Sequence, residues 1–178
     1  MFTILPILPC IFVGMKTLIL TRHAKSDWGN LRLDDFDREL NERGLRDAPE
    51  MGRRLLERGV QLDIMVSSSA KRAEQTSTLL ANAMAYPIEK IQWDGKLYHA
   101  PIYIIDEAVY ALPNHINVAM IVCHNPGITH FVNSVAGMVT DDLATCGMVA
   151  FTLDTDVWEN FRQVKSKLLF YDYPKKTL

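Results

Sequence analysis

The chain has 178 residues, which fits one domain, and its 48% hydrophobic and 22% charged residues match an ordinary globular protein. A formal net charge of −2 and a pI near 6.2 give no basic surface, so we expect no nucleic-acid partner. The three cysteines are far apart and show no CxxC or Cys/His metal spacing, which indicates reduced thiols in a cytoplasmic protein.

The chain begins with an apolar stretch, MFTILPILPCIFVGM, that carries no charge before Lys16. It lacks the basic region that opens a signal peptide, and Pro6 and Pro9 would interrupt a short membrane helix. Met15, followed by KTLILTRHAKS, is typical of a natural chain start. We therefore predict an N-terminal extension at 1–14 (a tail or a start-site artefact), then a single domain at 15–178. No membrane contact is expected, and an anchor or export signal remains the alternative.

Strand and helix patterns alternate along the rest of the chain. An apolar run of 4–8 residues predicts a buried strand, and apolar positions three or four apart predict a helix. Gly59 is expected to end the first helix, and serines are candidate N-caps for the second. Strands interleaved with helices predict an α/β domain of three layers, α/β/α, with a mostly parallel central sheet. The expected strands are 16–21, 62–68, 91–98 (weakly), 117–124, 147–154 and 166–173, and the expected helices are 41–58, 70–85, 100–113 and 127–137.

Three of the predicted strands end on polar residues that could meet. The first ends on Arg22 and His23, the second on serines 67–69 with Arg72 one turn further on, and the third on His124. Carboxyl ends of parallel strands lie at one edge of a sheet, where ligands bind. Two arginines together with helix N-termini predict a site for a phosphate-like anion, and a neutral histidine can attack phosphorus.

Each of these features also has an ordinary structural explanation. A histidine at a strand end is more often structural than catalytic, an arginine in a helix is usually solvated, and HNPG by itself is a turn. The coincidence of three such strand ends is what favours a site.

At these residues the sequence resembles the histidine phosphatase superfamily. The motifs that carry the resemblance are RHAKS, SSSAKRAEQT and CHNPGI, and it extends from about Lys16 to the C-terminus. Within the superfamily the chain resembles the short SixA-type phosphohistidine phosphatases, through DFDRELNERG at 35–44 and LYHA at 97–100. Glu39 stands where a proline is common in that group. The resemblance implies a phosphoglycerate-mutase-like fold without a large cap.

The resemblance also implies roles for individual residues. His23 would be the nucleophile that accepts the phosphoryl group, Arg22 and Arg72 would bind its equatorial oxygens, and His124 would donate a further hydrogen bond. No metal and no cofactor is implied. Further residues are expected to bind phosphate or to line the rim of the pocket, namely Lys25, Ser26, Tyr98, His99 and Asn125.

The region of LYHA differs from the mutase-like members, which place a glutamate there as general acid. This chain offers Tyr98 and His99 instead, and Asp94 is not clearly equivalent. His99 is about equally well explained as an acid or as a structural residue. Without a clear acid, a phosphoramidate, which expels an imidazole, is favoured over a phosphoester, which expels an alkoxide.

Only 24 residues lie between His99 and His124, too few for a large cap. An open site suits phosphate carried on another protein, because small-metabolite enzymes more often enclose their substrate. Three hypotheses follow. The preferred one is a phosphatase acting on a phosphohistidine-bearing protein. The second is a phosphatase of the same mechanism acting on a small phosphorylated molecule, and the third is a non-catalytic phosphate-binding module.

Overall fold

The computed structural model describes residues 14–29 and 32–176. The predicted extension at 1–14 therefore lies outside the described residues, apart from Gly14. Among the described residues, no helix combines the length and the apolar character needed to cross a membrane.

A six-stranded sheet forms the centre of the domain, in the order β3-β2-β4-β1-β5-β6. The first four strands in this order run parallel, and β5 and β6 are antiparallel to their neighbours. The mostly parallel sheet predicted from the sequence is confirmed. The strands are β1 (Lys16–Arg22), β2 (Ile64–Ser68), β3 (Ile91–Asp94), β4 (Val118–Cys123), β5 (Met148–Leu153) and β6 (Ser166–Asp172).

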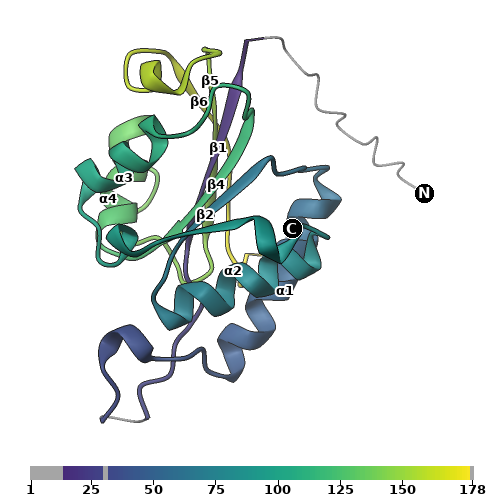
Figure 1. The fold of residues 1–178 in the computed structure, drawn as a ribbon, viewed down its shortest axis with the longest axis vertical. Coiled ribbons are helices and arrows are strands. Elements are labelled where there is room, and N and C mark those ends of the chain that lie inside the picture. Colours follow the sequence, from purple (N-terminus) through teal and green to yellow (C-terminus); the bar gives the residue numbers. More distant parts are fainter. Residues whose placement is uncertain (1–13, 30–31, 177–178) are drawn as a thin grey trace.

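Helices cover both faces of the sheet, α1 and α2 on one side and α3 and α4 on the other (Figure 1). Each face has its own apolar core, and β1 contributes to both because successive side chains of a strand point to opposite faces. Leu18 and Leu20 pack toward α3 and α4, whereas Ile19 packs toward α1 and α2. The predicted three-layer architecture is confirmed. The helices are α1 (Glu42–Glu57), α2 (Lys71–Ala83), α3 (Ile102–Tyr110) and α4 (Gly127–Ala136).

The local signals in the sequence explain most of the helix ends. Asn41 caps α1, because its side chain accepts a hydrogen bond from the backbone N–H of Gly44 at 3.0 Å. Gly59 adopts a positive φ of 74° after the helix, as a terminating glycine does. The serine N-cap predicted for α2 is wrong. Ala70 occupies that position, and Ser68 instead accepts from the Ala70 N–H at 3.3 Å.

The sequence predicted no 3-10 turn, and two of those in the described residues lie near the end of the sheet that carries the site. The predicted strand at 91–98 stops at Asp94, and the chain then turns at η3 (Gly95–Leu97). The second turn, η1 (Asp35–Asp37), lies in the long connection between β1 and α1. This connection projects from the carboxyl end of β1 (Figure 1).

The register of the sheet brings three strand ends to the same level. Arg22 of β1 pairs with Cys123 of β4, and Ser67 of β2 pairs with Val122 of β4. The residues that follow these strands therefore emerge side by side. Gly127 packs the turn after β4 closely onto the chain before α3, since a Cβ there would lie 1.8 Å from the Ala100 carbonyl oxygen.

Candidate active site

The imidazole of His23 is held in one tautomer directly after β1. Its Nδ1 lies 2.7 Å from the carbonyl oxygen of Ala24, and because a carbonyl only accepts, Nδ1 carries the hydrogen. Nε2 therefore keeps its lone pair and accepts a hydrogen bond from Nε of Arg72 at 3.2 Å. This arrangement leaves Nε2 as the basic, nucleophilic atom of the ring.

Burial also keeps this imidazole neutral. Only 8% of His23 is exposed, and burial lowers its pKa to about 3. The hydrogen bond to Ala24 opposes the shift, and the positive charges of Arg72 and Arg22 add to it. At neutral pH the ring is therefore unprotonated.

We expect His23 to remain neutral as the pH falls through 6.5, the ordinary value for an imidazole. An NMR titration that follows its Cε1–H resonance should show no protonation between pH 8 and pH 5 in the folded protein. The unfolded chain takes up a proton near pH 6.5 that the folded chain does not, so the free energy of unfolding should fall as the pH drops below that value. A midpoint between pH 6 and 7 for His23 would contradict this description.

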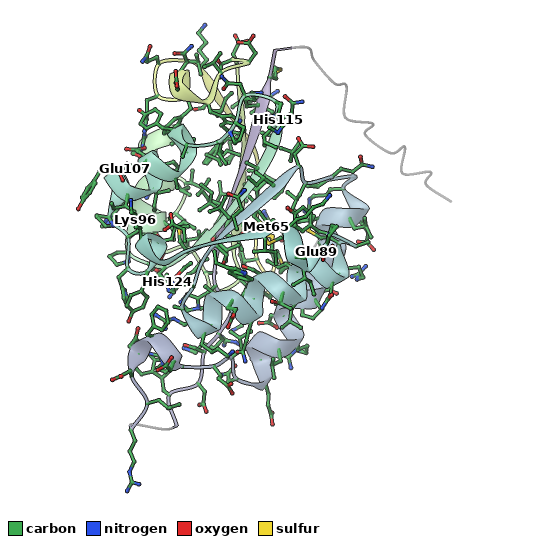
Figure 2. The ribbon with its side chains drawn as sticks, viewed as in Figure 1. Met65, Glu89, Lys96, Glu107, His115 and His124 are labelled. Atoms are coloured by element: carbon green, nitrogen blue, oxygen red, sulfur yellow. The ribbon has the colours of Figure 1, made fainter. Side chains whose placement is uncertain are left out.

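His124, directly after β4, stands beside His23, with ring centroids 4.9 Å apart. Figure 2 shows His124 at the end of the sheet near η1, and His115 at the opposite end. Nε2 of His124 lies 2.8 Å from Oγ of Ser68. Oγ accepts from the Ala70 N–H and carries a hydrogen that it can donate to Nε2, and with that bond the ring hydrogen lies on Nδ1.

Nδ1 of His124 is buried and has no hydrogen-bond partner among the described residues. Burial, together with the nearby His23 and Arg72, lowers the pKa of His124 to about 2, so this ring is neutral too. A buried N–H without an acceptor is costly and is commonly satisfied by a ligand or water. His124 therefore offers one hydrogen-bond donor next to the nucleophilic atom.

Arg72, in the first turn of α2, lies between His23 and η1. It is 2% exposed, and the other hydrogen bonds of its guanidinium go to Asp35. Its Nη2 donates to Asp35 Oδ2 at 2.8 Å, and its Nη1 donates to the Asp35 carbonyl oxygen. These contacts hold the guanidinium beside Nε2 of His23.

The carboxylate of Asp35 accepts hydrogen bonds from four side chains. Oδ1 accepts from Arg38 at 2.5 Å, and Oδ2 accepts from Arg72, from the Tyr98 hydroxyl at 2.7 Å and from His99 Nε2 at 3.0 Å. Desolvation by itself raises the pKa of this carboxyl, but the hydrogen bonds from Tyr98, His99 and Arg72 outweigh it and lower the pKa well below the ordinary range. Asp35 is therefore ionised at neutral pH.

Arg22 extends from β1 toward the loop 137–147 between α4 and β5. Its Nη1 donates to the Leu143 carbonyl oxygen at 2.5 Å and lies 3.3 Å from Asp142 Oδ2. Asn125 also donates to Asp142 and to the Leu143 carbonyl oxygen. Nε of Arg22 is buried without a partner among the described residues, so this arginine still has a donor to offer.

Tyr98 and His99 line the edge of the site with aromatic rings. Their centroids are 4.3 Å apart, and each lies 5.5 Å from the ring of His124. His99 adopts a positive φ of 49°, which is uncommon outside glycine and is often found at functional positions. Both predicted rim residues therefore lie next to His124.

Lys25 and Ser26 make contacts with the connection that carries η1. The hydroxyl of Ser26 is buried and accepts a hydrogen bond from Arg38. The Lys25 carbonyl oxygen accepts from the Asn41 backbone N–H at 3.0 Å. These hydrogen bonds therefore stabilise the connection that carries η1.

The structure brings Arg22, His23, Arg72 and His124 to one end of the sheet, with Asn125, Tyr98 and His99 around them. Three residues at the site were missed in the sequence. Ser68 was noted only as part of a strand end, Asp35 only within a motif, and Asp142 not at all. The string DFDRELNERG carried a signal for Asp35, because an acidic residue shortly after a predicted cationic site is a candidate partner for it.

Comparison with known families agrees with this geometry. A family model described as the histidine phosphatase superfamily (branch 1) matches residues 18–94, a segment that contains Arg22, His23 and Arg72. A 2,3-bisphosphoglycerate-dependent phosphoglycerate mutase from Methylobacterium sp. (strain 4-46) is 35% identical over 74 residues. The match covers 40% of this chain and 36% of the mutase, so the chain matches only about a third of that relative's length.

Solved structures match over almost the whole chain. A structure assigned as the phosphohistidine phosphatase SixA from Nakamurella multipartitia has a TM-score of 0.79 at 23% identity, over 92% of this chain and 98% of that one. The corresponding structure from Agrobacterium tumefaciens has a TM-score of 0.75 at 25% identity, over 89% and 98%. A protein histidine phosphatase SixA in complex with tungstate also has a TM-score of 0.75, at 19% identity, over 89% and 97%.

These neighbours have the phosphoglycerate-mutase-like fold without a large cap, as the sequence predicted. Residues 18–94 are thus similar to the histidine phosphatase superfamily, and the domain shares the fold of the SixA structures.

Proposed function

We propose that this chain is a phosphatase that hydrolyses phosphohistidine on a protein substrate, through a covalent phosphohistidine intermediate at His23. One observation carries the proposal. A buried, neutral imidazole presents the lone pair of Nε2 to the guanidinium of Arg72 at 3.2 Å, with Nδ1 tied to a backbone carbonyl. A nucleophile placed next to fixed cationic donors is what transfer of an anionic phosphoryl group requires.

The first step transfers the phosphoryl group to the protein. Nε2 of His23 attacks phosphorus, the bond to the leaving group breaks, and the leaving group keeps the bonding electron pair. Arg72, Arg22 and the N–H of His124 donate to the equatorial oxygens, which carry the negative charge in the transition state. Water then attacks phosphorus, releases inorganic phosphate and regenerates His23.

The ionisation of Asp35 favours a nitrogen leaving group. A phosphoester expels an alkoxide, which needs a proton from a general acid, whereas a phosphoramidate can expel a neutral imidazole. Asp35 is the carboxyl group that accepts a hydrogen bond from Arg72, and its lowered pKa leaves it without a proton at neutral pH. His99 remains available as an alternative acid, since its ring adjoins that of His124.

The openness of the rim favours a substrate borne on a protein. The side chains of Asp35 and His99 are 39% and 50% exposed, and no large insertion separates His99 from His124. The neighbour with tungstate bound is a protein histidine phosphatase that holds a phosphate-like oxyanion, which supports the same ligand chemistry here.

The mutase relatives favour a second candidate. Two of them are 35% and 36% identical to this chain over 74 and 72 residues, and their names describe mutases of phosphoglycerate, a small metabolite. A phosphatase of the same mechanism acting on a small phosphoester is therefore the alternative. A phosphate-binding module without activity is the third candidate.

Parallel turnover assays separate these candidates. We expect kcat/KM for a phosphohistidine-bearing protein domain to exceed that for a panel of small phosphoesters by on the order of 10²-fold or more, the size of the contribution that a general acid makes to ester cleavage. The His23→Ala variant serves as the control for spontaneous hydrolysis of the labile substrate. Faster turnover of an ester would select the second candidate, and absence of both turnover and phosphoenzyme would select the third.

A further inference from the structure

At this site the positively charged side chains are more buried than the negatively charged ones. The cationic groups lie inside, where Arg72 is 2% exposed beside the buried His23. Two carboxylates lie further out, each paired with one of the arginines. Asp35, 39% exposed, pairs with Arg72, and Asp142, 72% exposed, pairs with Arg22.

This separation places the carboxylates on the side of the leaving group. The nucleophile is buried at the inner end of the site, and in-line displacement puts the leaving group on the opposite side of phosphorus. That side must open toward solvent for the leaving group to depart. Asp35 and His99 are partly exposed residues of the rim, and they contact each other through Oδ2 and Nε2.

The contact between His99 and Asp35 shows which group this carboxylate accepts. A carboxylate can only accept, so Nε2 of His99 carries the hydrogen in their 3.0 Å contact. An imidazole N–H is therefore already bound to Asp35 in this structure. The ring of His99 is half exposed, so an imidazole from a substrate can take its place on Oδ2.

We propose that Asp35 determines leaving-group specificity: it favours an imidazole that presents an N–H, and it disfavours a leaving group that carries negative charge. The imidazole half of this inference rests on the proposed function. The rejection of anionic leaving groups does not, because it follows from like-charge repulsion alone.

The transfer balances without an added proton. The substrate is a phosphoimidazolium, with phosphorus on one ring nitrogen and a hydrogen on the other. As Nε2 of His23 forms its bond to phosphorus, the P–N bond breaks and its electron pair stays on the departing nitrogen. The ring leaves as neutral imidazole and keeps its hydrogen on the far nitrogen. By accepting a hydrogen bond from that N–H, Asp35 stabilises the protonated substrate that departs most easily.

The test compares three phosphoryl donors on the wild-type chain and on Asp35→Asn, which removes the charge and keeps the shape. The donors are phosphoimidazole, phenyl phosphate and 4-carboxyphenyl phosphate. We expect Asp35→Asn to lower the kcat/KM ratio of phosphoimidazole to phenyl phosphate about tenfold or more, as for loss of a hydrogen bond to a charged group. The ratio of 4-carboxyphenyl phosphate to phenyl phosphate should rise several-fold. Where turnover of an ester is too slow to measure, its competitive inhibition constant replaces kcat/KM.

Asp37→Asn is the matched control, since it makes the same charge change on the same turn at an exposed side chain. It should leave both ratios unchanged. If Asp35→Asn does not fold, Asp142→Asn at the other arginine should show the same relief of discrimination against the carboxylated donor. An equal loss on all three donors in Asp35→Asn would overturn the inference, because it would mean that Asp35 only positions Arg72. Wild-type turnover of phenyl phosphate but not of phosphoimidazole would instead overturn the proposed function, and the two esters would still test the charge effect.

Discussion

Replacing His23 with alanine is expected to abolish phosphoenzyme formation and to lower kcat by on the order of 10⁴-fold or more, as for loss of a covalent nucleophile. His23 is the histidine whose Nε2 adjoins the guanidinium of Arg72. The neighbouring His124 has its Nε2 beside the Ser68 hydroxyl rather than beside a guanidinium. Rapid-quench trapping with a labelled donor measures the adduct, and steady-state assays measure kcat.

His124→Ala is the matched comparison for this prediction. It removes a donor rather than the nucleophile, so its cost should be smaller, on the order of 10²–10³-fold. Phosphoenzyme should still form on His124→Ala, more slowly. A normal burst from His23→Ala, or a larger loss from His124→Ala than from His23→Ala, would show that the two roles are reversed.

Arg72→Ala should lower kcat/KM by at least as much as His124→Ala, on the order of 10³-fold, because it removes a charge together with the donors of the guanidinium. The variant also loses the Nε–H that faces Nε2 of His23 and one of the cations that lower its pKa. The pKa of His23 should therefore rise toward 6.5, so that activity is lost at a higher pH on the acid side than in the wild type. A pH profile of kcat/KM reports this shift.

Arg72→Lys separates charge from geometry in this prediction. It keeps the positive charge, so the pKa of His23 should stay lowered, but a single ammonium cannot contact His23 and Asp35 in the fork that the guanidinium makes. We expect a loss of rate with little change in the pH profile. Wild-type activity in Arg72→Ala would contradict the role of Arg72 as a phosphate ligand.

The sequence was sufficient to predict the layered fold, because buried parallel strands and amphipathic helices each leave a distinct pattern. The pairing of Arg22 with Cys123 follows from that fold, and it sets His23 and His124 side by side. These residues could be foreseen because strand ends in a parallel sheet share one edge.

The string DFDRELNERG offers several acidic residues, so local pattern could not select Asp35 among them. Asp35 lies in a short turn within a long connection, and its importance comes from contacts with Arg72, Tyr98 and His99, which are 37 to 64 positions away in sequence. The buried role of Ser26 has the same origin, because Arg38 reaches it only once the connection folds back. Side-chain partners across loops depend on tertiary packing, which neither propensity nor periodicity records.

The chemistry of the trapped phosphoenzyme tests the central claim most directly. The wild-type chain would be incubated briefly with a labelled phosphohistidine-bearing protein, quenched in denaturant, and its adduct tested for stability in acid and in base before the modified peptide is located by mass spectrometry. A phosphate bound to a histidine nitrogen should be labile in acid and stable in base, and we expect it on the peptide that contains His23. An acid-stable, base-labile adduct, or a phosphate located on a residue other than His23, would contradict the mechanism.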